Sequence, residues 1–326
     1  MPDVIKQFED WLRNDQGRGE LTIKAYLADV RSFVKWWRQT YGDHRFDLVA
    51  VTPTDIRDYR SRLTKVDHQK TSSVNRRLAA LRTFYKWAML HDMVRRSPLA
   101  GLKMDRQQKA APRWLEPRAE YYLQQAMEQR LQILPPDEIL TPTDRLIIRD
   151  AALIALMWKA GLRVSEVAAL DVHDLKIQSS QRGVAVVRLG KGRKSREVPL
   201  NAGTILTLRH WLKIRPTYGH ASALFTSKTG RRLAPRAIQA VVEQVGRVAA
   251  SKVQARGNDE REIIDALNAL TPHVLRHTCG KRLLDAGAQL TEVAEILGHE
   301  DLNVTRRYTQ PSSTDLQRAV NRIDNI

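Results

Sequence analysis

Several features that would place the chain in a familiar class are missing from its sequence. The 326 residues include a single cysteine, Cys279, which excludes a disulfide framework and fits a reducing compartment. No apolar run reaches the roughly 18 residues needed to span a bilayer, so we expect no membrane partner. The first seventeen residues mix acids and bases without an apolar signal region, and we therefore expect a cytoplasmic protein.

The sequence also lacks the residue patterns of several catalytic sites. We find no pair of carboxylates placed for metal-dependent nuclease chemistry and no Cys/His cluster for zinc. The glycine-containing stretch "LGKGRKSRE" lacks the spacing of a phosphate-binding P-loop. We therefore expect neither a metal nor any other cofactor.

Acidic residues are too few to balance the basic ones. Against 54 lysines and arginines stand 36 acids, which gives a formal net charge of +18. Such an excess is costly in self-repulsion unless a polyanion relieves it. Half of the excess lies in residues 51–110, with fourteen bases and five acids, and the other half lies in residues 111–326. Two basic regions are typical of a protein that binds nucleic acid on two sides. The alternative is a basic protein without such a partner, which the composition alone does not exclude.

Apolar residues at helical spacing dominate the first 102 residues, which we predict to be an N-terminal helical DNA-binding domain. In "SSVNRRLAALRTFYKWAM", Val74, Leu78, Leu81 and Tyr85 form one apolar stripe. The other faces of this helix carry four bases and no acid, which is usually only a solvated surface. Here the basic excess favours phosphate contact, and the predicted DNA-binding residues are Arg76, Arg77, Arg82 and Lys86.

The second region begins after a basic stretch that contains proline and glycine, residues 103–113, which we interpret as a linker. In residues 114–326 the pattern is mainly helical, and the strongly apolar "RLIIRDAALIALMWKAG" predicts a buried helix ending at Gly161. Valines flanking a basic tip in "VAVVRLGKGRKSREVPL" predict a β-hairpin, with Arg193 and Lys194 as DNA contacts. The expected fold is mainly α with a small antiparallel sheet, in two domains.

Cations, imidazoles and a phenol in this second region form the candidate catalytic set. They are Arg163, Lys191, His273, Arg276, His299 and Tyr308. Each has an ordinary alternative explanation, such as a helix-end contact or a turn lysine, but their concentration in one basic domain favours a shared site. The spacing of His273 and Arg276 puts both on one helix face, and Gly298 ends a short amphipathic helix immediately before His299.

These side chains are suited to metal-free phosphoryl transfer to tyrosine. Arginines can hold the non-bridging oxygens of a phosphodiester and stabilise the charge of the transition state. A tyrosine hydroxyl can attack phosphorus as a covalent nucleophile. A lysine can give a proton to the departing 5′-oxygen, which is otherwise a poor leaving group.

Four segments resemble, in order, the catalytic segments of the tyrosine recombinases, also called the phage integrase family. They are "GLRVSEV", "GKGRKSREVPL", "HVLRHT" and "LGHEDLNVTRRYTQ". The resemblance implies a C-shaped clamp on duplex DNA and a 3′-phosphotyrosyl intermediate, with Tyr308 as nucleophile and the other five candidates around the phosphate. It also implies a nucleoid-associated homotetramer on two inverted-repeat sites, with a C-terminal tail helix that docks on a neighbouring protomer. Docking of this helix on its own catalytic domain is the alternative.

The expected role is integration, excision or resolution of a mobile element. The stretches "QILPPDEILTPTD" and "SKVQARGNDEREIIDALNAL" look longer than in compact Xer-type members. Xer-like resolution of chromosome or plasmid dimers remains an alternative, as do a type IB topoisomerase and a non-catalytic DNA-binding regulator. A basic RNA-binding module would need aromatic stacking platforms, and no cluster of this kind is visible.

Overall fold

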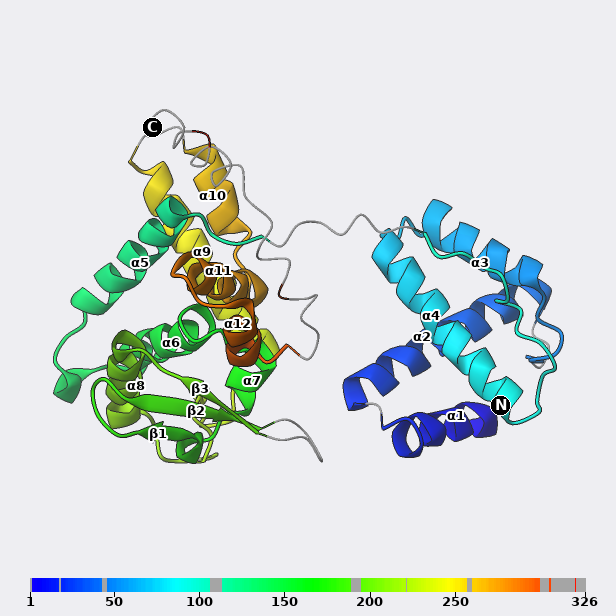
Figure 1. The fold of residues 1–326 in the computed structure, drawn as a ribbon, viewed down its shortest axis with the longest axis horizontal. Coiled ribbons are helices and arrows are strands. Elements are labelled where there is room, and N and C mark those ends of the chain that lie inside the picture. The colour runs from blue at the N-terminus through cyan, green and yellow to red at the C-terminus, as the bar shows by residue number, and fades with distance from the viewer. Residues whose placement is uncertain are drawn as a thin grey trace. The chain divides into compact units, whose positions relative to one another are not determined.

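The computed structural model describes most of the chain. The described residues are 2–17, 19–42, 46–105, 113–188, 195–220, 222–256 and 260–299, together with Thr305 and Val320. The chain divides into two compact units, Met1–Ala110 and Ala111–Ile326 (Figure 1). Helices and one small antiparallel sheet account for the regular structure of the described residues, so the predicted fold class is confirmed.

The N-terminal unit is built from four helices. They are α1 (Pro2–Asn14), α2 (Glu20–Tyr41), α3 (Pro53–Lys65) and α4 (Thr71–Leu90). Their shared core is rich in aromatic rings, and Phe8, Phe33, Tyr59, Phe84 and Trp87 are all almost completely buried. The predicted apolar stripe of α4 faces this core, since Val74, Leu78, Leu81 and Tyr85 are buried.

The end of the N-terminal unit packs onto two of its helices. Arg82 donates to the carbonyl oxygen of Leu102 at 2.8 Å, and Asn75 donates to that of Asp105 at 2.9 Å. Arg60 on α3 forms an ion pair with the Asp105 carboxylate. Residues 102–105 are therefore held against α3 and α4, although part of this segment falls within the linker expected from the sequence.

The C-terminal unit surrounds one long apolar helix. Its helices are α5 (Pro117–Gln132), α6 (Pro142–Trp158), α7 (Val164–Ala169), α8 (Ala202–Ile214), α9 (Pro235–Gln254), α10 (Arg261–Asn268), α11 (Pro272–Asp285) and α12 (Leu290–Leu297). Two 3-10 turns, η1 (Asp137–Ile139) and η2 (Val172–Asp174), complete them. Residues 148–158 of α6 are buried except for Asp150, and Gly161 follows with a φ of 69°. The predicted central helix is confirmed.

A three-stranded antiparallel sheet lies in the same unit. Its order is β1 (Leu175–Ile177), β2 (Gly183–Val187) and β3 (Arg196–Pro199). Val187 pairs with Arg196 at the last described step of the β2–β3 ladder, so the predicted hairpin is confirmed. The tip residues Lys191, Arg193 and Lys194 lie outside the described residues.

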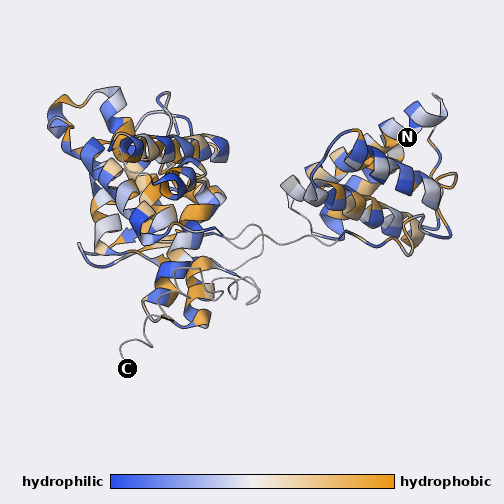
Figure 2. Cartoon of the chain, turned by 90° about the horizontal axis from the view of Figure 1, so that it is seen from above, coloured by the Kyte–Doolittle hydropathy of each residue, from blue (hydrophilic) through white to orange (hydrophobic). Residues whose placement is uncertain are grey.

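Side-chain hydropathy follows the helical pattern in both units. In Figure 2, hydrophobic and hydrophilic residues alternate along most of the helices, as expected where one face packs on a core. None of the helices in the described part of the chain is long and apolar enough to cross a membrane.

Candidate active site

Arg163 lies just before α7 and is held by two different parts of the fold. Its Nη1 lies 2.8 Å from Oε1 of Glu166, and its backbone nitrogen donates to Oε2 of the same residue at 2.8 Å. Its Nη2 donates to the carbonyl oxygen of Gly298 at 2.9 Å. The side chain is still 35% exposed, so its guanidinium is oriented by the protein and remains accessible to a ligand.

Arg276 occupies a deeper position on α11. It is 3% exposed, and it donates to the carbonyl oxygens of Gly161, at 2.5 Å, and of Leu297. Its Nη1 also lies 3.9 Å from Oε2 of Glu166. Arg276 therefore ties the segment after α6 to the end of α12, and it shares the Glu166 carboxylate with Arg163.

His299 follows the turn that ends α12. Gly298 adopts a left-handed conformation, with φ 64° and ψ 53°, which a glycine adopts without strain. The half-buried imidazole has Nδ1 2.9 Å from the hydroxyl of Thr305, a residue that is itself fully buried. Burial first, and then the positive charges of Arg276 and Arg163, lower the pKa of His299 to about 4. The ring is therefore neutral at physiological pH.

His273 lies one turn before Arg276 on α11. Its side chain is exposed, and its ring centroid lies 6.3 Å from that of His277. The structure thus brings Arg163, Arg276 and His299 together, with His273 on the helix that supplies Arg276. Lys191 and Tyr308 lie outside the described residues.

Two residues of this centre were missed by the sequence reasoning. Glu166 accepts hydrogen bonds from Arg163 and from Arg196, whose Nη1 and Nη2 each lie 2.9 Å from one carboxylate oxygen. Burial would raise the pKa of the Glu166 carboxyl, but the hydrogen bonds from Arg196 and from the Arg163 backbone outweigh it and lower the pKa. Glu166 stands at the third position of a helix, where a carboxylate caps the first turn, so its place in "GLRVSEV" was a usable signal. Arg196 had none, because it is one of several bases in the hairpin segment.

The predicted DNA-binding residues of α4 differ in how far they are engaged within the protein. Arg76 forms an ion pair with Asp29, whose side chain is 3% exposed. Arg77 donates to the hydroxyl of Ser32 at 2.8 Å, and Arg82 donates to the carbonyl of Leu102. Lys86 is exposed, and no ion pair involves it among the described residues. Of the four, Lys86 is the side chain best placed to meet an external phosphate.

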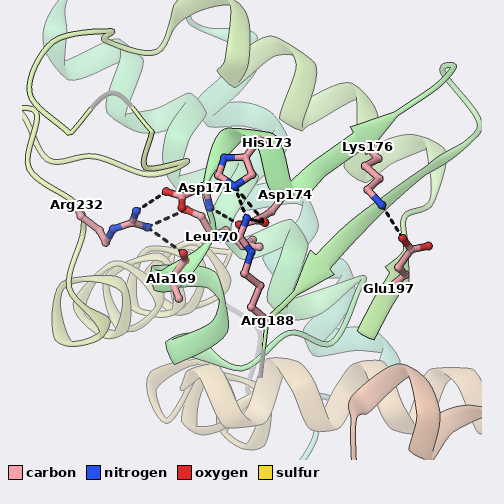
Figure 3. A network of polar contacts seen from close by, with 9 residues as sticks. All are labelled: Ala169, Leu170, Asp171, His173, Asp174, Lys176, Arg188, Glu197 and Arg232. Carbon is pink, nitrogen blue, oxygen red and sulfur yellow. Dashed lines mark hydrogen bonds and ion pairs between the residues drawn. The ribbon is translucent and has the colours of Figure 1, made fainter. Parts of the chain in front are cut away.

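One group of described residues offers possible metal ligands, at the start of the sheet (Figure 3). It consists of Asp171, His173 and Asp174, but guanidinium groups already engage it. Arg232 pairs with Asp171 and also donates to the carbonyls of residues 168–170. Arg188 lies 2.6 Å from Oδ1 of Asp174 and contacts the ring of His173. This arrangement is better explained as an anchor for the sheet than as a metal site.

Comparison with known proteins agrees with this architecture. Residues 129–314 match the phage integrase family, and residues 5–92 match the N-terminal SAM-like domain of phage integrases. The chain belongs to the phage integrase family of tyrosine recombinases. The resemblance found in the four sequence segments is therefore confirmed, and it extends to the N-terminal unit.

Similar curated proteins cover nearly the whole chain. The tyrosine recombinase XerC of Azotobacter vinelandii is 32% identical over 310 residues, which are 94% of this chain and 90% of the relative. The XerC of Mycobacterium sp. (strain KMS) is 32% identical over 316 residues, 95% and 94% of the two chains.

Solved structures share the fold at lower identity. A XerH recombinase bound to a palindromic difH substrate has a TM-score of 0.68 at 20% identity, covering 97% of this chain and 84% of that one. The integrase of the transposon Tn1549, in complex with circular intermediate DNA, has a TM-score of 0.64 at 20% identity, covering 97% and 98%. The fold is thus found both in Xer-type recombinases and in a transposon integrase.

Proposed function

We propose that this chain is a site-specific recombinase that cleaves and rejoins duplex DNA through a 3′-phosphotyrosyl intermediate. The observation that supports this most strongly is the pairing of Arg163 and Arg276 through one carboxylate, Glu166, beside a neutral His299. Two guanidiniums fixed next to each other suit the two non-bridging oxygens of a single phosphate. Membership of the tyrosine recombinase family supports the same chemistry.

In the proposed reaction, Arg163 and Arg276 bind the scissile phosphate and stabilise the charge of its transition state. Tyr308 gives up its phenolic proton to solvent as its oxygen attacks phosphorus and forms the phosphotyrosine bond. The bond from phosphorus to the 5′-oxygen breaks, and Lys191 gives that oxygen its proton. Attack by a 5′-hydroxyl of the partner strand reverses these steps and rejoins the DNA. The scheme requires no energy-supplying cofactor, because the phosphotyrosine bond conserves the energy of the phosphodiester. It requires no metal, because the two arginines stabilise the charge of the phosphate.

The two histidines complete the phosphate-binding group. A Thr305 hydroxyl that donates to Nδ1 of His299 would leave the proton of the neutral ring on Nε2. His299 could then donate one hydrogen bond to a phosphate oxygen without adding a charge. The exposed His273 precedes Arg276 by three residues on α11, a spacing that supports its role as a further donor.

We assign the two units to the two halves of a clamp. Residues 1–102 would form the core-binding domain, residues 103–113 the linker, and residues 114–326 the catalytic domain with its tail helix. Each protomer would close around one half of a duplex site with inverted repeats, and four protomers would join two such sites. The similarity to recombinases solved with DNA substrates supports the choice of duplex DNA as partner.

Integration, excision or resolution of a mobile element is the role we favour, and the shared fold of the Tn1549 transposon integrase supports it. Xer-like resolution of chromosome or plasmid dimers is the second candidate, favoured by XerC relatives that match nearly the full chain. Trapping the protein covalently on host DNA and sequencing the attached fragments separates the two roles. Sites at the ends of an inserted element indicate the first, and a single chromosomal site or plasmid sites indicate the second.

The catalytic assignment is tested with a nicked duplex that carries the recognised site. Wild-type protein should give a covalent adduct that survives denaturation, and mass spectrometry should place the nucleotide on Tyr308. Tyr308→Phe should bind the same duplex with similar affinity and form no adduct. Binding without any wild-type adduct would instead indicate a regulator, and relaxation of supercoiled DNA without strand exchange would indicate a topoisomerase.

A further inference from the structure

Arg196 is the first residue of β3, and its side chain is unusually enclosed for an arginine in a basic hairpin. The side chain is 11% exposed and makes a two-pronged ion pair with Glu166, itself 10% exposed. Its Nε is buried and finds no hydrogen-bond partner in the described part of the chain. Replacing a buried ion pair by apolar groups of similar volume is often neutral or stabilising, so holding a strand end does not by itself explain this arginine.

The guanidinium of Arg196 also packs directly against the turn that precedes His299. A Cβ placed on Gly298 would lie 2.7 Å from both Cζ and Nη1 of Arg196. This space is therefore already filled by the guanidinium, and only a glycine fits beneath it. The strand and the turn are thus in contact, in agreement with the packing of α12 beside β3.

Arg163 holds the same turn from another direction. It donates to the carbonyl oxygen of Gly298, while Arg196 lies against the Cα of that residue. Both arginines are bound to Glu166, which fixes their separation. The turn before His299 is therefore contacted by the guanidiniums of Arg163 and Arg196, which both bind the Glu166 carboxylate.

We propose that Arg196 is a positioning residue for the recombination reaction: it holds the Gly298 turn, and thereby the imidazole of His299, in place beside Arg163. This proposal rests on the proposed function only for its catalytic consequence. The relation between Arg196 and His299 is a property of the protein without DNA, so it can be measured separately.

The test uses Arg196→Met, which keeps much of the volume and removes the charge and both hydrogen bonds. Arg188→Met is the matched control, because Arg188 follows β2 on the same hairpin but pairs with Asp174, away from Gly298. Arg196→Met should bind DNA nearly as well as wild type and form the covalent adduct roughly 10- to 100-fold more slowly, the loss expected from a small misplacement of a catalytic group. Arg188→Met should cleave at close to the wild-type rate.

An NMR titration of the histidine rings without DNA gives the readout that a purely structural role would not change. Arg196 is one of the positive groups that lower the pKa of His299, after burial and the charges of Arg276, Arg163 and His277. In Arg196→Met the pKa of His299 should therefore rise above its wild-type value of about 4. In Arg188→Met it should stay where it is.

Arg196→Lys distinguishes the effect of the positive charge from the effect of the two hydrogen bonds that position the turn. It also provides a test if the methionine variant does not fold. A lysine keeps the positive charge but cannot bind both oxygens of Glu166 at once. It should leave the pKa of His299 near the wild-type value and still slow cleavage. Wild-type cleavage by Arg196→Lys, or equal slowing by Arg196→Met and Arg188→Met, would overturn the proposal. Failure of the wild-type protein to form any adduct would overturn the proposed function instead, while the titration would still show whether the Arg196 guanidinium acts on the His299 ring.

Discussion

Nη2 of Arg163 donates to the carbonyl oxygen of Gly298 at 2.9 Å, which joins the start of α7 to the end of α12. These two residues are 135 positions apart in the sequence. The contact exists because Glu166 fixes the other edge of the guanidinium, so that only one orientation satisfies both partners. The phosphate-binding geometry we propose therefore depends on a carboxylate that need not touch the phosphate.

Glu166→Gln should accordingly weaken both folding and catalysis. The amide cannot neutralise the enclosed Arg196, and loss of one partner from a buried charge pair costs about 3 kcal/mol of unfolding free energy. Cleavage should fall by at least about tenfold, since Arg163 loses its orientation. Urea denaturation and single-turnover cleavage measure the two effects. Glu197→Gln is the control: its pair with Lys176 is more than half exposed on both sides, so its loss should cost under about 1 kcal/mol.

Stability should depend on pH through His299. Burial and neighbouring arginines hold the pKa of this ring at about 4 in the folded protein, whereas an unfolded histidine titrates near ~6.5. The unfolded state therefore binds the proton more tightly, so the stability present above pH ~6.5 is lost as pH falls toward 4. Urea denaturation of the wild type should show a steeper loss between these values than His299→Gln. Parallel curves for the two proteins would contradict the lowered pKa.

The sequence predicted the elements of the fold better than the contacts of the site. A long apolar stretch located the buried α6, and helical periodicity located the core face of α4, because both signals are local and strong. The short strand β1 was not predicted, since three residues carry too little pattern and its place depends on pairing with β2. The β2–β3 hairpin, by contrast, was predicted, because valines on both sides of a glycine-containing tip are a clear local pattern.

Among the site residues, too, the sequence predicted those that belong to local motifs and missed those that depend on tertiary contacts. Arg163 and Arg276 could be named from motifs, but their common partner Glu166 and the contact of Arg196 with Gly298 are tertiary. For the bases of α4, the sequence predicted more external contacts than the structure leaves available. A helical pattern cannot distinguish an exposed lysine from an arginine that pairs with a buried carboxylate. Arg76 is such an arginine, and its partner Asp29 lies on α2.

Lys191 should act as the general acid, a role its place in the hairpin tip predicts. Lys191→Ala should cleave ordinary DNA about 100-fold or more slowly, because the 5′-oxygen then leaves without a proton. A substrate with sulfur at the bridging 5′ position has a leaving group that needs none, and its cleavage should be largely restored. Arg163→Ala is the control, since loss of a phosphate contact should slow both substrates alike. Equal failure of Lys191→Ala on both would leave the lysine as a phosphate contact only.

Lys86 and Arg76 should respond differently to the same substitution. Lys86→Gln removes an exposed charge, so DNA affinity should fall and the slope of log affinity against log salt should decrease by about one. Arg76→Gln leaves the carboxylate of Asp29 buried with a weaker partner, so unfolding free energy should fall by roughly 1 kcal/mol, a discounted value because Arg76 is 48% exposed. Salt-dependent binding and urea denaturation of both variants check this. An unchanged slope for Lys86→Gln would show that this face of α4 does not meet phosphate.

The tail beyond Tyr308 should act between protomers. Leu316, Ala319, Val320 and Ile323 are spaced as one apolar stripe behind a Thr/Asp cap signal. A helix of about ten residues is marginal alone in water and needs a surface to dock on. Val320, the described residue of this stripe, is 56% exposed, which favours docking on a neighbour over docking on its own unit.

A chain that ends at Gln310 should therefore bind a single DNA site as well as the full chain and assemble poorly on two sites. Recombination should fall much more than binding, because the missing contact is one between protomers. Native gels with one-site and two-site DNA measure the two steps separately. Leu316→Asp tests the apolar stripe in a chain of full length. If the stripe makes the contact between protomers, this variant should show the same assembly defect as the shortened chain. Normal two-site complexes from the shortened chain would show that the tail docks on its own protomer.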